Sequence, residues 1–136
     1  MREILFRGKP KNLKKYKWVQ GQLLHHRDNL SVIYSEEADH PIGVMPETVG
    51  QFTGLTDKNG KRIFEGDVVI YDNSPYNAYC EPIRGVIAWR NGSLCFKYKP
   101  LSSVMYRALC SDDFFAAKCD VIGNIHDNPE LLEDAE

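Results

Sequence analysis

Two short apolar segments joined by Asn91-Gly92 constrain the fold of this chain most strongly. In GVIAWRNGSLCFKY, residues 85–98, apolar and polar side chains alternate on both sides of the Asn-Gly pair. Asn-Gly favours a type I′ turn, because both central residues of that turn have positive φ. The turn places four apolar side chains on one side of a hairpin: Trp89 facing Leu94, and Ile87 facing Phe96. That side is predicted to face the core.

Alternation with a period of two recurs along the chain, whereas helical periodicity is scarce, and this predicts a mainly β protein. We expect strands over residues 3–7, 16–24, 30–34 and 121–125, and an irregular strand followed by a helical turn within residues 101–118. Gly21 indicates a bulge in its strand or the close approach of another backbone. Residues 72–84 hold two prolines and two asparagines and are predicted to form a long loop.

Two short helical elements are expected. Pro46 can begin a single helical turn that Gly50 ends. Asn128 is a favourable N-cap and Pro129 fits the first helical position, which predicts a short C-terminal helix. Because no Pro/Gly/Ser-rich linker divides the 136 residues, we expect one domain over residues 1–136.

The segment GQFTGLTDKNGKRIFEGDVV, residues 50–69, allows three interpretations: a calcium loop, a phosphate loop or a hairpin corner. A calcium loop that starts at Asp57 would need Gly and a bidentate Glu where Arg62 and Val68 stand. A Walker-type phosphate loop would need a hydroxyl residue at Arg62, and the spacing is one residue too long. Asp and Gly at the two ends of D-K-N-G instead favour a type I turn in a three-residue hairpin loop. The expected cross-strand pairs are Asp57 with Lys61 and Leu55 with Ile63.

Residues suited to catalysis or metal binding are scattered through the sequence. The histidines and cysteines match no zinc spacing, and the cysteines form no C-x-x-C pair; they are Cys80, Cys95, Cys110 and Cys119. Cys95 is expected to be a small packing residue beside Ala88. The loose catalytic candidates are Cys110-Ser111, Asp112-Asp113 and His126-Asp127, although adjacent carboxylates more often form a solvated turn or a helix cap. We therefore expect no enzyme activity, no metal and no cofactor.

Charge is polarised between the two ends of the chain, although the net charge is only −2. Residues 126–136 hold five acids and no Lys or Arg. The N-terminal arm, residues 7–18, interleaves basic residues with Tyr16 and Trp18, a pattern that can grip phosphates and stack on bases. Its candidate nucleic-acid-binding residues are Arg7, Lys9, Lys11, Lys14, Lys15, Lys17 and Trp18. Alternatively, the two aromatic residues belong to the core or its rim and the lysines decorate a loop.

Hydropathy favours a soluble protein. The longest apolar runs are a few residues long, far short of the roughly 20 that cross a bilayer. The N-terminus MREILFRGKPKN lacks the continuous apolar region of a signal peptide. We therefore expect no membrane association and no export, and reduced cysteines in the cytoplasm.

Five segments, in chain order, resemble a known family: MREILFRGK, KWVQGQLL, PETVGQFTGLTDKNGKRIFEGDVV, GVIAW and VIGNIHDNPELL. They are similar to the YopX-like family of small bacteriophage and prophage proteins, and residues 46–69 are the most specific part. The resemblance implies a mainly β, single-domain pseudo-barrel of antiparallel hairpins with a small helical element. It also implies the cytoplasm of a bacterial host, and it is compatible with self-association. It assigns no activity to any residue.

Together these features favour a phage or prophage accessory protein that is a non-enzymatic protein-interaction or self-assembly module. The expected partners are further copies of the chain (a homo-oligomer) or a phage or host protein. The alternative is nucleic-acid binding through the basic N-terminal arm, residues 7–18.

Overall fold

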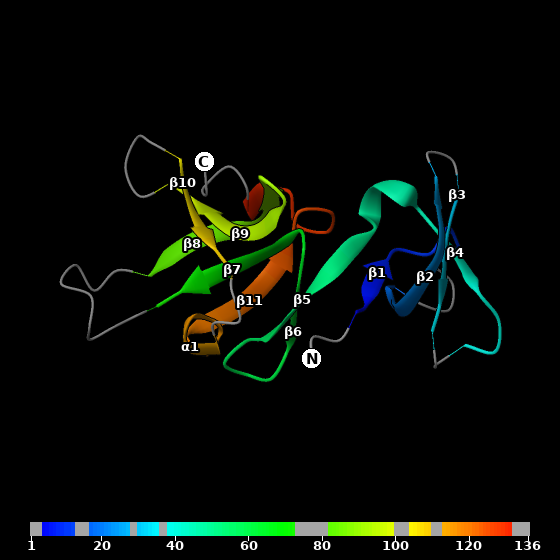
Figure 1. Ribbon diagram of the computed structural model, residues 1–136, viewed down its shortest axis with the longest axis horizontal. Helices are drawn as coiled ribbons and strands as arrows, with labels where there is room; N and C mark the ends of the chain where they lie inside the picture. The colour runs from blue at the N-terminus through cyan, green and yellow to red at the C-terminus, as the bar shows by residue number, and fades with distance from the viewer. Residues whose placement is uncertain are drawn as a thin grey trace. The chain divides into compact units, whose positions relative to one another are not determined.

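The computed structural model describes residues 4–12, 17–27, 30–35, 38–72, 82–99, 104–109 and 113–131. These ranges contain eleven strands in two antiparallel sheets, so the protein is mainly β, as predicted (Figure 1). The chain divides into two compact units, residues 1–52 and 53–136, here called the N-terminal unit and the C-terminal unit. The single domain expected over residues 1–136 stays a prediction.

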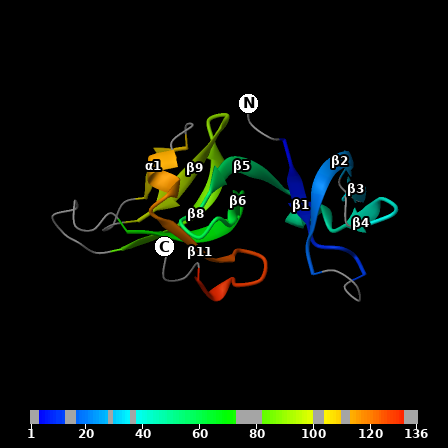
Figure 2. The same ribbon diagram turned by 90° about the horizontal axis from the view of Figure 1, so that it is seen from below.

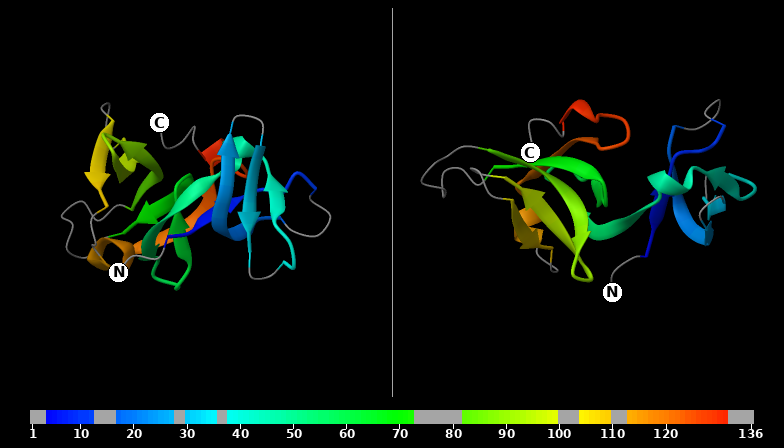
Figure 3. Two further views of the ribbon diagram at one scale, coloured as in Figure 1. Left: turned by 45° about the vertical axis from the view of Figure 1, so that its right-hand side comes forward. Right: turned by 90° about the horizontal axis from the view of Figure 1, so that it is seen from above.

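Four strands build the N-terminal unit: β1 (Phe6–Gly8), β2 (Val19–Arg27), β3 (Leu30–Tyr34) and β4 (Ile42–Val44). Each pairs antiparallel with the next, and Figure 3 shows β2 and β3 side by side. The segment after β1 returns to β4 through a bridge between Pro10 and Val44. The N–H of Lys11 donates to the carbonyl of Gly43 at 3.1 Å, and the N–H of Met45 donates to that of Lys9 at 2.8 Å. The strands therefore close on themselves around a small apolar core.

The core of the N-terminal unit is apolar, and β2 and β3 approach each other closely beside it. Val19, Ile33 and Val44 are buried at its centre, and Phe6, Leu23, Ile42 and Val49 pack around them. Gly21 lies where a Cβ atom would stand 1.9 Å from the carbonyl oxygen of Tyr34. The close backbone approach predicted for Gly21 is therefore confirmed.

The connection after β4 follows the predicted pattern. Pro46–Thr48 forms one turn of 3₁₀ helix, η1, and β5 (Gly50–Thr56) begins where the helical turn was expected to end. The first two expected strands are displaced toward the C-terminus, since β1 covers residues 6–8 and β2 covers residues 19–27. β3 has the predicted bounds.

The C-terminal unit combines a hairpin with a five-stranded sheet. The hairpin is formed by the end of β5 and β6 (Arg62–Phe64), and the sheet has the order β10-β9-β8-β7-β11. The sheet strands are β7 (Asp67–Tyr71), β8 (Ile83–Arg90), β9 (Ser93–Tyr98), β10 (Met105–Ala108) and β11 (Cys119–Asn124). A short helix, α1 (Asp113–Ala116), also belongs to this unit, and Figure 2 shows it leading into β11.

The Asn91-Gly92 hairpin forms as predicted. Both turn residues have positive φ, 52° and 80°, and Trp89 pairs with Leu94 as Ile87 pairs with Phe96. Three of the four side chains enter the core, whereas Trp89 is 46% exposed. The prediction that Trp89 belongs to the core is therefore wrong: this large side chain lies beside the exposed turn at the end of β8, and only its smaller partner Leu94 is covered.

Aromatic rings fill the core of the C-terminal unit. Phe115 of α1 lies 4.7 Å from Tyr71 and 5.3 Å from Phe96, measured between ring centroids. Leu55 and Ile63 of the β5–β6 hairpin join the same cluster. This arrangement confirms the strand and helical turn predicted within residues 101–118, for the part of that range that the structure describes.

The expected long loop and the C-terminal helix are described only in part. Residues 73–81 of the loop lie outside the described residues, and residues 83–84 belong to β8. Glu130 and Leu131 have helical backbone, and the rest of the predicted helix lies outside the described residues. The side chain of Asn128 accepts the N–H of Asn124 at 3.2 Å.

Candidate interaction surfaces

The D-K-N-G segment is a hairpin corner whose carboxylate holds three backbone groups. Asp57 donates its N–H to the carbonyl of Lys61 at 2.7 Å, and Gly60 has φ +80°, as a three-residue loop requires. One carboxylate oxygen of Asp57 accepts the N–H of Asn59 at 2.8 Å and of Lys61 at 2.9 Å. The other accepts the N–H of Val121, on β11, at 3.1 Å. The most patterned stretch of the sequence thus fixes the hairpin to β11.

Burial acts against the charge of Asp57, yet the carboxylate stays ionised. Burial alone would raise its pKa, but the three N–H donors and the nearby Lys61 ammonium outweigh it and hold the pKa of this carboxyl below its usual range. A carboxylate that is saturated by backbone donors is a structural anchor, since its oxygens already have partners.

The other described candidates for chemistry also have structural roles. Cys95 and Cys119 are buried thiols. Burial, and then the charge of Asp57, raise the pKa of Cys119 to about 12, so its nucleophilic thiolate is suppressed. Asp127 accepts the side-chain amide of Asn124 within the turn after β11. Cys110, Ser111 and Asp112 lie outside the described residues, as does the side chain of Asp113.

Histidine and cysteine do not converge on a metal site in the described ranges. His26 shares a hydrogen bond with Ser31, and His25 pairs with Val32 on the neighbouring strand. Within those ranges, no three His, Cys, Asp or Glu side chains come together as a metal ion would need.

The basic N-terminal arm is partly built into the N-terminal unit. The guanidinium carbon of Arg7 lies 4.7 Å from the centroid of the Trp18 ring, and the ammonium of Lys9 lies 5.9 Å from it. Arg7 is buried and Trp18 is half-buried, so the ring belongs to the rim of this unit. Lys11 and Lys17 are exposed. Lys14 and Lys15 lie outside the described residues, together with Tyr16.

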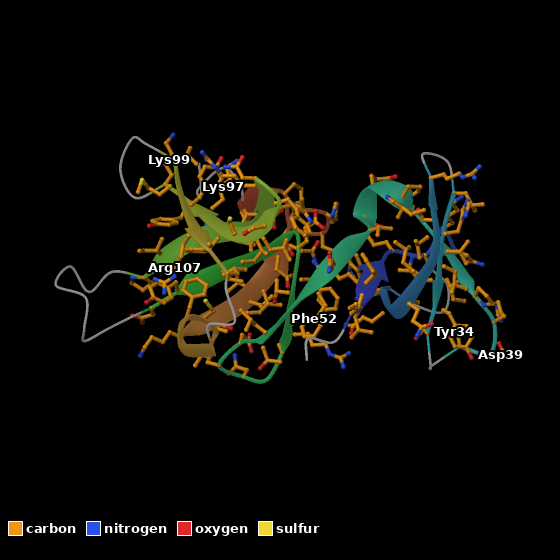
Figure 4. The ribbon with its side chains drawn as sticks, in the orientation of Figure 1. Tyr34, Asp39, Phe52, Lys97, Lys99 and Arg107 are labelled. Carbon is orange, nitrogen blue, oxygen red and sulfur yellow. The ribbon has the colours of Figure 1, made fainter. Side chains whose placement is uncertain are left out.

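The outward face of β3 carries larger apolar residues than its inward face. Leu30 and Tyr34 are each 45% exposed, and Val32 between them is half-buried. The alternate residues, Ser31, Ile33 and Ser35, are buried. We call Leu30, Val32 and Tyr34 the apolar strip; Figure 4 shows Tyr34 toward the lower end of this unit. An exposed strand face that is richer in apolar surface than its buried face is typical of a contact surface.

On the β4 side, no side chain of the described residues covers Val32 of the apolar strip. β4 places Gly43 opposite Val32, and no atom lies within 4 Å of the position a Cβ atom would take there. On the other side β2 contributes Gln22, His25 and Arg27, which pair with Tyr34, Val32 and Leu30. A bulge in β2 presents Leu24, which is 53% exposed. The strip is therefore accessible and carries no formal charge of its own.

The sequence pattern of β3 alone gives the wrong orientation for the apolar strip. In LSVIYS, residues 30–35, the residues of one parity are Leu, Val and Tyr and those of the other are Ser, Ile and Ser. Alternation alone would direct the more apolar parity inward. The structure has the opposite orientation, because β3 must present Ile33 opposite Leu23 to complete the small core.

Family comparison identifies the chain. The family model described as YopX protein matches residues 5–133. The chain belongs to the YopX family. The match covers both units, and it includes the hairpin corner at Asp57 and the turn after β11. No curated protein matches this YopX-family chain.

A solved structure shares the fold. The chain is similar to the protein described as "Crystal structure of protein EF1440 from Enterococcus faecalis", with 25% sequence identity and a TM-score of 0.56. The alignment covers 97% of this chain and 99% of the other. In the part of the chain that our structure describes, no helix has the length and apolar character that crossing a membrane requires.

Proposed function

We propose that this YopX-family protein is a non-enzymatic phage or prophage accessory protein that acts in the bacterial cytoplasm by self-association. The observation that supports self-association most directly is the apolar strip on β3. Its proposed occupant is the same strip of a second copy of the chain. The buried thiols and the saturated Asp57 carboxylate support a non-enzymatic role, since the described groups best suited to chemistry are used in packing and hydrogen bonding.

Charge favours a second copy as the occupant. A two-fold axis near Val32 would bring Leu30 of each copy toward Tyr34 of the other, because an isologous interface pairs each residue with its counterpart reciprocally. The three side chains carry no formal charge, and the two-fold arrangement keeps Arg27, which pairs with Leu30, at opposite ends of the strip in the two copies. The exposed apolar residues of β8 and β10, in contrast, lie beside cations such as Arg90 and Lys97, and two such faces would repel each other.

Replacing Leu30 by Lys tests this function. A charge in the strip of each copy must be desolvated on association, so L30K is expected to raise the dimer dissociation constant by about 100-fold or more. Light scattering over a wide range of protein concentration measures the change in mass.

Val104 provides a matched control for Leu30. It is also 45% exposed, but it lies outside a strand in the C-terminal unit. V104K adds the same charge and is expected to associate like the unmodified chain. Equal weakening by L30K and V104K would reject the strip as the interface, and a monomer at all concentrations for the unmodified chain would reject self-association.

A further inference from the structure

The sequence of the C-terminal unit contains a long stretch without acidic residues. From residue 82 to residue 111 there is no Asp or Glu, and there are five basic residues: Arg84, Arg90, Lys97, Lys99 and Arg107. The stretch includes β8, β9 and β10, which are neighbours in the sheet. Its positive charge is therefore carried by these three strands.

Strand register separates these cations between the two faces of the sheet. Successive side chains point to opposite faces, and Ile87 and Phe96 are buried in the core on one of them. The residues of the other parity face outward, and they include Arg84, Arg90, Lys97 and Tyr106. Lys99 continues the outward parity of β9. We call Arg84, Arg90, Lys97, Lys99 and Tyr106 the basic face.

Arg107 lies on the opposite side of the sheet and is used in packing. Its guanidinium carbon lies 4.7 Å from the centroid of the Phe115 ring and 5.7 Å from that of Tyr71. Figure 4 shows Arg107 away from Lys97 and Lys99, which extend together from β9. Lys97 lies on β9 and Lys99 directly follows the end of that strand, so extended backbone would separate them by roughly 6.8 Å. This spacing is comparable to the distance between successive phosphates of an extended nucleic-acid strand.

An aromatic ring lies among the outward cations. The guanidinium carbon of Arg90 lies 3.8 Å from the centroid of the Tyr106 ring, and Tyr106 is 38% exposed. The cross-strand row between them consists of small residues, Ala88, Cys95 and Ala108. The Tyr106 ring therefore contacts the Arg90 guanidinium in a part of the face where the neighbouring side chains are small. A flat ligand can stack there against the ring or the guanidinium.

The basic face has a limit on the β11 side. Its row through Arg84 continues across Ile70 of β7 to Asp120 of β11. The carboxylate of Asp120 accepts the side-chain amide of Asn59 at 3.2 Å. A polyanion is therefore expected to follow β8, β9 and β10 and to stop short of β11.

We propose that the basic face binds single-stranded nucleic acid, with phosphates on Arg90, Lys97 and Lys99 and a base stacked on Tyr106. Single strands expose the flat faces of their bases, whereas the bases of a duplex are stacked on each other and out of reach of a side chain on a sheet. This site is distinct from the N-terminal arm, where Arg7 is buried against Trp18. It is also distinct from the apolar strip, so it adds an activity to self-association.

The test uses a labelled oligothymidylate titrated with the full chain at low and at physiological salt. K97Q/K99Q is expected to weaken binding at low salt by about 10-fold and to reduce the slope of log affinity against log salt by about 1.4, because two phosphate contacts are removed. Y106A is expected to weaken binding by about 10-fold with an unchanged slope, because stacking is not ionic. K11Q/K17Q is the matched control; it removes the same charge from two exposed positions of the N-terminal arm and is expected to change affinity less than about 2-fold.

The proposal would be overturned by no binding of the oligothymidylate at low salt, by a larger loss for K11Q/K17Q than for K97Q/K99Q, or by tighter binding of a duplex of the same length. Competition with poly-glutamate distinguishes an acidic protein segment from nucleic acid. Displacement of the oligothymidylate by poly-glutamate at equal charge concentration would also contradict the proposal, because a stacking site adds affinity that poly-glutamate cannot match. Thermal unfolding of each variant near the unmodified temperature shows that a loss of binding is not a loss of fold.

Discussion

Replacing Asp57 by Asn is expected to lower the free energy of unfolding by about 3 kcal/mol. In asparagine an NH₂ group replaces one carboxylate oxygen, and the other oxygen loses its charge. The backbone N–H groups of Val121, Asn59 and Lys61 would then face either a donor or a weaker acceptor. For a chain of this length the loss corresponds to a melting temperature lower by on the order of 10 °C. Differential scanning calorimetry measures it.

Asp39 offers the matched control for Asp57. Its side chain is 91% exposed, and D39N removes the same charge from a site that does not join strands. We expect its melting temperature to stay within about 2 °C of the unmodified value. Equal melting of D57N and the unmodified protein would mean that the hairpin corner does not fix β11.

The contribution of Asp57 depends on pH in a defined direction. Its pKa is lowered on folding, so its stabilisation is present above the unfolded value near 3.9 and is lost as the pH falls through the folded value. The difference in unfolding free energy between the unmodified chain and D57N is therefore expected to be constant from pH 7 to about pH 5 and to shrink below about pH 4. A difference that grows in acid would contradict this sign.

Replacing Gly21 by Ala is expected to cost about 3 kcal/mol or more, the upper range for overpacking. The added Cβ atom would stand 1.9 Å from the carbonyl oxygen of Tyr34 and 2.8 Å from its carbon. Both are backbone atoms, so they cannot turn away as a side chain can, and β2 and β3 must separate.

Two tryptophans make the effect of G21A separable by unit. Trp18 lies in the N-terminal unit and Trp89 in the C-terminal unit. In a W89F background the tryptophan fluorescence comes from Trp18, so urea unfolding of G21A followed by this fluorescence reports on the N-terminal unit. G43A is the matched control, since nothing lies within 4 Å of its added Cβ atom, and we expect a change of less than about 0.5 kcal/mol. Similar urea midpoints for G21A and G43A would contradict the close approach of β2 and β3.

Local patterns in the sequence predicted the turns of this fold well. Asn91-Gly92 and D-K-N-G determine their own backbone angles, and the register of each hairpin follows directly from its turn. The helical turn predicted to begin at Pro46 also forms, because the fixed φ of proline favours the first helical position. These elements could be predicted because the decisive interactions lie within a few residues of one another.

The surfaces could not be predicted in the same way. Whether Trp89 enters the core depends on the packing around the end of its hairpin, where only Leu94 is covered. The orientation of β3 depends on Leu23, on another strand. The basic face forms because three strands bring Arg90, Lys97 and Tyr106 together. These residues are far apart in the sequence, whereas the lysines of the N-terminal arm are close together and were therefore predicted as the nucleic-acid-binding site. A charge count along the chain from residue 82 to residue 111 would have indicated it.

Sedimentation velocity of the unmodified chain, at low and then at high sodium chloride, tests the central claim of self-association through a neutral apolar strip. Association between the basic N-terminal and acidic C-terminal ends would weaken as salt screens their charges, whereas burial of apolar surface does not weaken in this way. We predict a dimer whose fraction rises with protein concentration and is unchanged or larger at high salt. A monomer under all conditions, or a dimer that dissociates as salt is added, would contradict the account.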